Sequence, residues 1–318
     1  MGLTGRWVGP VFAITGVFGF SAKAILVKLA YDWHPLDAVT LLAMRMLYAA
    51  PFFIAMAWWA GRRGDAKPMS RADKWRLALL GVIGYYLSSL LDFMGLAYIS
   101  ASLERLVLYL YPTFVVLLSA LLLGKPITRR AVLALVLSYA GIALVFVSDL
   151  SVSGSPGTLW LGGSLVFACS ILYALYLVLA SDIIGRLGSM RFTAWAMLAS
   201  TGAIVLHFLV TRDLGLLRAP TPVQSLALCM AIFSTVLPTW LIAEAVRRLG
   251  ANAAALIGSL GPVFTMGLGA SILGEPVHGV QLVGAALVLV GVILVTLRIR
   301  SAGSAATDRA QQGIAPES

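Results

Sequence analysis

Stretches of about 20 apolar residues recur along most of this 318-residue chain. A helix of about 20 residues, rising 1.5 Å per residue, crosses the roughly 30 Å hydrocarbon core of a membrane. Soluble domains are about 45–50% apolar and about 25% charged, whereas this chain is 60% hydrophobic and 11% charged. The sequence therefore excludes an ordinary soluble protein and predicts an all-α polytopic membrane protein.

The apolar stretches predict ten transmembrane helices arranged as two inverted five-helix repeats. The expected spans are 8–30, 36–60, 76–98, 101–123, 128–148, 159–181, 190–211, 224–246, 251–273 and 278–298. Five spans per half is an odd number, so the two halves enter the membrane in opposite senses. Residues 1–148 are the expected first repeat and 159–298 the second. Between them lies a Ser- and Gly-rich periplasmic linker, 149–158, and a disordered cytoplasmic tail follows at 299–318.

The two halves share residues at a constant offset of 150 positions. Pro112 corresponds to Pro262, Gly141 to Gly291, and Gly-Lys-Pro at 124–126 to Gly-Glu-Pro at 274–276. The match covers spans four and five against nine and ten, while the first three spans of each half match in position but hardly in residues. A duplicated, mostly apolar chain is typical of a secondary transporter.

Basic residues gather on one side of the predicted topology. With the N-terminus inside, the outer loops hold only Arg212 and Arg218. The inner connectors and the C-terminal end hold Arg62, Arg63, Lys67, Arg71, Lys74, Arg76, Lys125, Arg129, Arg130, Arg186, Arg191, Arg247, Arg248, Arg298, Arg300 and Arg309. Because cytoplasmic loops are rich in Lys and Arg, we expect a multi-pass protein of the inner (plasma) membrane with both termini cytoplasmic. The basic residues behind the net charge of +10 lie in the connectors, where they orient a membrane protein, so no nucleic-acid partner is expected.

Ten spans in two homologous halves, each ending in a Gly-x-Pro junction, resemble the EamA type of the drug/metabolite transporter (DMT) superfamily. The residues similar to the first two helices of that family are Phe18-Gly19, Lys23, Lys28, Pro35 and Arg45. The chain departs from the family where many members carry Trp in place of Phe18 and Glu in place of Lys125. The resemblance covers about residues 8–298 and implies export of a small metabolite or amino acid, although a shared fold does not fix a substrate.

Five charged residues of the first repeat are candidates for a charged site within the membrane, and the predicted topology places all five in the outer half: Lys23, Arg45, Asp92, Glu104 and Arg105. A charge at a helix centre costs about 2.5–3.5 kcal/mol, so such residues usually face a cavity or a partner. On the functional interpretation, Lys23 and Arg45 meet a carboxylate or phosphate, and Asp92 meets an amine or carries a coupling proton. The alternative is a structural salt-bridge network. Glu104 and Arg105, at the start of span four, are expected to reach the outer interface by snorkelling.

Further residues complete the predicted site. Tyr85, Tyr109, Tyr173 and Ser259 join Lys23, Arg45 and Asp92 as substrate-binding candidates, although aromatic residues at helical spacing more often serve packing. Glu244 is a second coupling candidate beside Asp92, the alternative being an intrahelical ion pair with Arg247 or Arg248.

Pro112 and Pro262 fall in the middle of spans four and nine. Proline removes a helical hydrogen bond and kinks the helix, and matched kinks in two repeats favour a gating role. The alternative is a static kink needed only for packing.

No motif indicates enzyme chemistry. The chain has no Walker loop and no His-Glu-x-x-His, and its three His residues are far apart, so no catalytic residue, cofactor or metal site is expected. Both cysteines, Cys169 and Cys229, lie in apolar segments and predict no disulfide framework.

The leading interpretation is a secondary transporter that moves a small charged or zwitterionic, amino-acid-like metabolite by alternating access, with export as the expected direction. The alternatives are an importer or exchanger of phosphorylated or nucleotide-linked metabolites and, less favoured, a polytopic enzyme acting on lipids. The expected partners are the small-molecule substrate and the lipid bilayer, and the sequence leaves a homodimer open.

Overall fold

The computed structural model describes residues 3–62, 69–124, 126–153, 156–249, 257–258 and 260–294. Throughout these residues the regular elements are helices and no strand occurs. Seven of the helices described are long and apolar enough to cross a membrane, and shorter apolar helices cover Val132–Val147, Gly261–Leu273 and Gly279–Leu294. These segments coincide with the ten predicted spans, so the prediction of an all-α polytopic membrane protein is confirmed.

The first half contains α1 (Leu3–Trp33), α2 (Ala38–Arg62), α3 (Arg71–Gly81), the π-helix η1 (Val82–Leu87), α4 (Ser88–Leu96), α5 (Ala101–Leu108), α6 (Tyr111–Leu123) and α7 (Arg129–Ser153). The second half contains α8 (Pro156–Leu187), α9 (Ser189–Thr211), the 3-10 turn η2 (Leu214–Arg218), α10 (Thr221–Ala231), the π-helix η3 (Ile232–Val236), α11 (Leu237–Leu249), α13 (Gly261–Leu268), the π-helix η4 (Gly269–Leu273) and the helix Gly279–Leu294. Helix α7 continues to Ser153 and α8 begins at Pro156, so much of the predicted linker 149–158 is helical. The predicted tail 299–318 lies outside the described residues.

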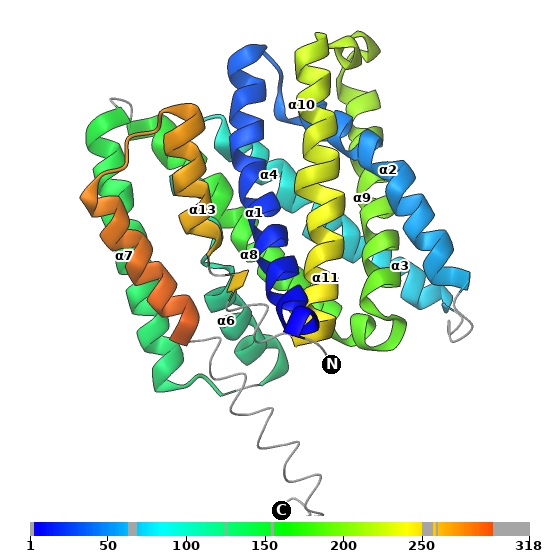
Figure 1. Cartoon of the computed structure of the whole chain (residues 1–318), viewed down its shortest axis with the longest axis horizontal. Coiled ribbons are helices and arrows are strands. Elements are labelled where there is room, and N and C mark those ends of the chain that lie inside the picture. The colour runs from blue at the N-terminus through cyan, green and yellow to red at the C-terminus, as the bar shows by residue number, and fades with distance from the viewer. Residues whose placement is uncertain are drawn as a thin grey trace, which may run out of the picture.

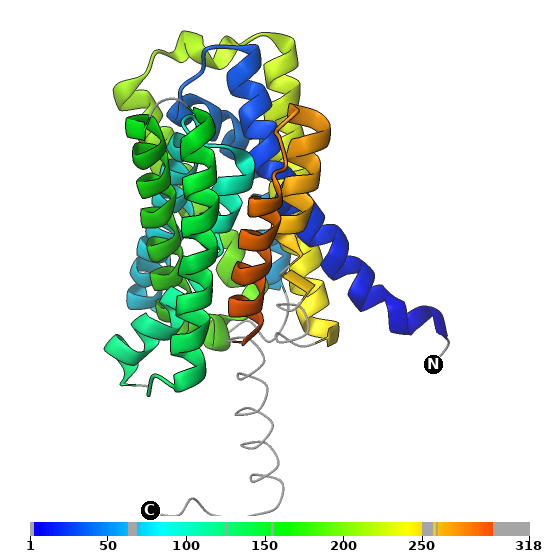
Figure 2. The same ribbon diagram turned by 90° about the vertical axis from the view of Figure 1, so that its left-hand side faces the viewer.

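The bundle has two distinct ends in Figures 1 and 2. Helix α1 begins at the lower end, and the helix Gly279–Leu294 finishes there as well. The α1–α2 connection lies at the opposite, upper end of Figure 1. The charge distribution of the sequence predicts that the lower end is cytoplasmic.

The 150-residue offset is visible in the backbone. The π-helices η1 and η3 begin at Val82 and Ile232, one offset apart, in spans whose residues hardly match. Gly124 and Gly274 end spans four and nine with φ of 65° and 66°. This left-handed region favours glycine because it lacks a Cβ. The duplication thus extends beyond the segments where residues are shared.

Each half packs against the other through equivalent helices. Helix α1 lies against α11 and α13, and its counterpart α8 lies against α4 and α6. Gly141 of α7 and Gly284 of the last described helix approach so closely that a Cβ on either would strike the backbone carbonyl of the other. Such reciprocal packing is the arrangement expected of inverted repeats related by a pseudo-two-fold axis.

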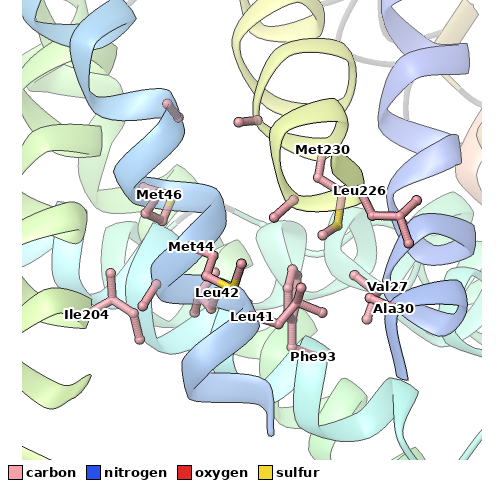
Figure 3. Close-up of a cluster of buried hydrophobic side chains, with 14 of the residues drawn as sticks. Val27, Ala30, Leu41, Leu42, Met44, Met46, Phe93, Ile204, Leu226 and Met230 are labelled. Atoms are coloured by element: carbon pink, nitrogen blue, oxygen red, sulfur yellow. The ribbon is translucent and has the colours of Figure 1, made fainter. Parts of the chain in front are cut away.

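The largest group of buried apolar side chains fills the upper half of the bundle. Figure 3 shows part of it, where α1, α2, α4, α9 and α10 meet. Phe93, Leu41 and Val27 are each fully buried there. These residues belong to the upper turns of their helices, so their packing closes the upper half of the molecule.

The two matched prolines occupy helix starts. Helix α5 ends at Leu108, and Pro112 lies in the first turn of α6; Pro262 lies in the first turn of α13. Proline is tolerated there because the first turn of a helix leaves its backbone N–H groups unbonded within the helix. The expectation of a kink in span four is therefore corrected to a full break between two short helices, with the connecting turn at Tyr109 and Leu110.

We expect Gly141→Ala to destabilise the protein, because the added Cβ must push α7 away from Gly284. Overpacking of this kind costs about 1–3 kcal/mol and should lower the melting temperature of the purified protein by several degrees. Gly267→Ala is the matched control, since a Cβ there meets nothing within 4 Å. Equal melting temperatures for the two variants would contradict the close contact.

Candidate functional site

A cavity of about 510 Å³ lies between the two halves, a size within the roughly 300–1,000 Å³ of small-molecule sites. Its lining comes from α1, α2, η1, α4, α5 and α6 of the first half and from α8, α9, η3 and α11 of the second. Of the predicted substrate-binding residues, Lys23, Arg45, Tyr85, Asp92, Tyr109 and Tyr173 all line this cavity. Ser259 lies outside the described residues.

Lys23 forms an ion pair in the wall of the cavity. Its Nζ lies 2.5 Å from Asp92 Oδ2 and 3.8 Å from Glu104 Oε1. The pair joins α1 to α4, and the side chain of Asp92 is almost completely buried. Loss of Lys23 would leave the Asp92 carboxylate buried without a cation, so this contact holds α1 against α4.

Arg45 is buried without a carboxylate partner. Only 5% of its surface is exposed, and no ion pair joins it to any acidic side chain of the described residues. Its Nη2 lies 3.5 Å from Ser89 Oγ, its guanidinium lies 5.0 Å from the centre of the Phe93 ring, and its Nε has no hydrogen-bond partner. Burying an unsatisfied charge is costly, so Arg45 offers the cavity a cation with unused donors.

Glu104 and Arg105 point into the protein, contrary to the expectation that they reach the outer interface. Glu104 is fully buried, and Arg105 is 6% exposed and lines the cavity. Arg105 Nε donates a hydrogen bond to Thr265 Oγ1 at 3.1 Å. Both residues belong to the short α5, and the break after Leu108 sets the direction of this helix independently of α6. Sequence reasoning that treated span four as one helix could not foresee this.

Tyrosine rings form another part of the cavity wall. Tyr111 and Tyr173 meet edge to face, with centroids 5.1 Å apart, and Tyr173 stacks on Tyr176 at 5.8 Å. Tyr176 donates a hydrogen bond of 3.0 Å to the hydroxyl of Tyr85, and Tyr109 donates one to the carbonyl of Gly258. The cavity therefore has a charged wall, formed by Lys23, Arg45, Asp92 and Arg105 of the first repeat. It also has an aromatic wall, to which Tyr85, Tyr109 and Tyr111 of the first repeat and Tyr173 of the second contribute.

Several pairs of residues related by the 150-residue offset line the cavity. The pairs that line it are Lys23 with Tyr173, Gly84 with Ser234, Tyr85 with Thr235, Ser89 with Thr239, Asp92 with Ile242, and Leu108 with Gly258. The cavity thus lies where the repeats meet, as in inverted-repeat transporters. Sequence reasoning missed Thr235, Thr239 and Ile242, although applying the offset to Tyr85, Ser89 and Asp92 finds them.

Three of the other candidate residues lie apart from the cavity lining. Glu244 accepts a hydrogen bond of 2.8 Å from Arg248 Nε, which is the intrahelical ion pair that the sequence offered as the alternative. Pro112 and Pro262 stand at the breaks of spans four and nine, beside lining residues such as Tyr111. A gating role for these prolines stays a prediction.

Contacts between the halves close the upper end. Glu275 accepts hydrogen bonds from the amide of Ala101 at 2.8 Å and the hydroxyl of Ser102 at 2.9 Å, which caps the N-terminus of α5 with a negative charge. Arg212 Nε lies 3.0 Å from Asp37 Oδ1. The cavity lining instead includes partly exposed residues of the lower half, such as Thr193 and Ala243. The described structure is therefore closed above the charged wall.

Comparison with known proteins agrees with this architecture. A sequence profile described as the EamA-like transporter family matches residues 7–147 and 160–297. Uncharacterized transporter YcbK of Bacillus subtilis is 30% identical over 285 residues, covering 87% of this chain and 88% of that protein. A protein of Streptantibioticus cattleyicolor, named a probable terminal-alkyne amino-acid exporter, is 24% identical and covers 92% of this chain and 93% of its own. A solved crystal structure, 19% identical, shares the fold with a TM-score of 0.63 over 92% of this chain and 98% of its own.

We expect Lys23→Ala and Arg45→Met to act in opposite ways on stability. Removing Lys23 leaves Asp92 buried without a cation, and breaking a buried pair costs about 3–5 kcal/mol. Removing Arg45 relieves an unpaired buried charge, so the melting temperature of that variant should equal or exceed that of the wild type. A loss in Arg45→Met as large as in Lys23→Ala would instead assign Arg45 to a structural salt-bridge network.

The Asp37–Arg212 contact, outside the membrane-spanning segments, should make the upper closure pH-dependent. Burial raises the pKa of Asp37, but hydrogen bonds from Thr40 and Arg212 and the charge of Arg212 together hold it below its usual value. A lowered pKa stabilises the folded state above the unfolded value of about 3.9, and this contribution is lost as the pH falls through the folded pKa.

The measurement is the difference in melting temperature between wild type and Asp37→Asn across pH. It should be constant above pH ~5 and shrink below pH ~4. Asp32→Asn, at an exposed carboxyl nearby, is the control for a general effect of charge removal. A wild-type advantage that persists unchanged at pH ~3 would count against the contact.

Proposed function

Since the chain belongs to the EamA-like transporter family, we propose that it exports a small amino-acid-like metabolite by alternating access. The observation that carries the proposal is Arg45, a buried cation without an anionic partner in the wall of a 510 Å³ cavity. A substrate carboxylate would supply the missing partner through charge-assisted hydrogen bonds. The name of the Streptantibioticus cattleyicolor relative, a probable amino-acid exporter, supports the same substrate class.

Asp92 supports a zwitterionic substrate. Its Oδ2 accepts from Lys23, but its Oδ1 is buried and has no hydrogen-bond donor. Asp92 and Arg45 both line the cavity and interact electrostatically. A substrate ammonium at Asp92 and a carboxylate at Arg45 would satisfy both groups, and the tyrosine rings would receive the remaining apolar part of the substrate.

The positive charge that the cavity lining leaves unpaired disfavours a phosphorylated substrate. A phosphate monoester carries nearly two negative charges at neutral pH, whereas Lys23 is already paired with Asp92 and Arg105 already donates to Thr265. A single carboxylate matches Arg45, which among the described lining cations is the one with a buried nitrogen that lacks a hydrogen-bond partner. This balance favours an amino acid over the sugar phosphates or nucleotide-linked metabolites of the alternative hypothesis.

The distribution of Lys and Arg supports an inner-membrane protein with both termini in the cytoplasm. The closed upper end is then periplasmic, and the substrate enters the cavity from the cytoplasmic side. Outward release requires the Glu275 cap and the Asp37–Arg212 pair to separate while an equivalent closure forms below. The broken spans four and nine give each repeat a short helix that can move in this exchange.

A thermal-shift screen of the purified protein against amino acids, organic acids and sugar phosphates tests the proposal. An amino acid at about 100 times its dissociation constant should stabilise the protein by about 2.7 kcal/mol. Arg45→Met should lose this shift, and Arg248→Met should keep it, since Arg248 pairs with Glu244 on the same helix away from the cavity. Stabilisation by sugar phosphates alone would favour the importer or exchanger of phosphorylated metabolites.

A further inference from the structure

Glu104 lies immediately behind the charged wall and is the least solvated carboxyl group of this region. It is fully buried, and it is absent from the described lining of the cavity, to which Asp92 belongs. Neither of its carboxylate oxygens has a hydrogen-bond partner. An ionised carboxylate in such surroundings carries a large solvation cost.

Two carboxyl groups share one ammonium here. Lys23 Nζ lies 2.5 Å from Asp92 and 3.8 Å from Glu104, and the Asp92 and Glu104 side chains lie close enough to interact directly. Asp92 Oδ1 and both oxygens of Glu104 lack a donor. One proton placed between the two carboxyl groups would satisfy an oxygen on each, as in other carboxyl pairs too close to ionise together.

The other titratable groups near Glu104 do not supply the hydrogen bonds that the Asp92–Glu104 pair lacks. Around Glu104 the charged groups are Lys23 on α1, Asp92 on α4 and Arg105 on α5 itself. Two neutral titratable groups also interact with it, the buried thiol of Cys169 on α8 and the hydroxyl of Tyr109, which donates to the carbonyl of Gly258. Helix α13 carries no titratable side chain. On α7, Tyr139 packs against Phe167, and Glu275 is occupied by the first turn of α5.

We propose that Glu104 and Asp92 share one proton, which the substrate ammonium displaces during transport. This inference rests on the proposed function and names its coupling site. In the empty cavity, Lys23 pairs with Asp92, and Glu104 donates its proton to Asp92 Oδ1. When the substrate ammonium reaches Asp92, the proton leaves Glu104 for water in the cavity, and Lys23 pairs with the new Glu104 carboxylate. The total charge is conserved, and one proton is exchanged for one substrate ammonium.

Exchange of a proton for the substrate would couple the direction of transport to the proton gradient. Proton and substrate compete for the same pair of carboxyl groups, so each half-cycle carries one or the other. An inward proton gradient would then drive the zwitterion outward. Glu104 acts through Asp92 and Lys23 without touching the substrate, which makes it a positioning and proton-binding residue.

The first test needs no substrate. Infrared spectra of the purified protein should show the carbonyl band of a protonated carboxylic acid, and Glu104→Gln should remove it. The glutamine can donate to Asp92 Oδ1 in place of the acid, so this variant should fold. Glu244→Gln, at a carboxylate paired with Arg248, should keep the band. A wild-type spectrum without the band, or a band lost only in Asp92→Asn, would overturn the proposal.

The second test measures protons released on binding, with L-phenylalanine as the probe. Calorimetric titrations in buffers of different ionisation enthalpy should report about one proton released per L-phenylalanine bound, and none in Glu104→Gln. Affinity in the wild type should rise about tenfold per pH unit while the proton is bound and stay constant in the variant. Binding without proton release would overturn the exchange but leave the amino-acid proposal standing. If no amino acid binds, the proposed function and the exchange step are both overturned. The infrared spectra would then still show whether Glu104 and Asp92 share a proton.

Discussion

The ammonium of Lys23 organises the charged half of this protein. It projects from α1 to Asp92 on α4 and lies within 4 Å of Glu104 on α5, so a single cation links three helices. Charges inside a membrane are costly and are kept only with partners or for function. Because Asp92 pairs with Lys23, Arg45 has no acidic partner and Glu104 has no hydrogen-bond donor. The two proposals for this site start from these groups: a substrate carboxylate binds Arg45, and a proton is held at Glu104.

The backbone features of the two repeats are symmetric, whereas the side chains that line the cavity are not. The π-helices η1 and η3, the left-handed glycines 124 and 274 and the prolines 112 and 262 recur at one offset, and these features set where helices bend, end and restart. The cavity residues at the same offset differ in chemistry, since Lys23 corresponds to Tyr173 and Asp92 to Ile242. Equivalent backbones allow the halves to exchange roles in alternating access, whereas the unequal side chains give the substrate one charged wall and one aromatic wall.

The sequence was a good guide wherever a property depends on composition and periodicity. It predicted the apolar helices, seven of which are described as long enough to cross a membrane, because the thickness of the hydrocarbon core sets the length of an apolar helix. It also gave Lys23, Arg45 and Asp92, because few charges occur within apolar stretches. It failed for Glu104 and Arg105, which were expected at the outer interface, because α5 ends at Leu108 and is buried from Ala101 to Val107. The pairing of Glu244 with Arg248 was among the predicted alternatives, since residues four apart on a helix are neighbours.

The sequence by itself determined the class of this protein: a duplicated chain of ten apolar helices with rare charges inside them, whose predicted topology is inverted. These properties are local, since hydropathy, charge and glycine or proline chemistry act over a few residues. The tertiary structure alone decided which charges are paired. Lys23 and Asp92 are 69 residues apart in the sequence, and nothing in their spacing distinguishes Lys23 from the unpaired Arg45. Only the packing of α1 against α4 and α5 brings two carboxyl groups to one ammonium, because an ion pair depends on distance in space and the helices must first be placed.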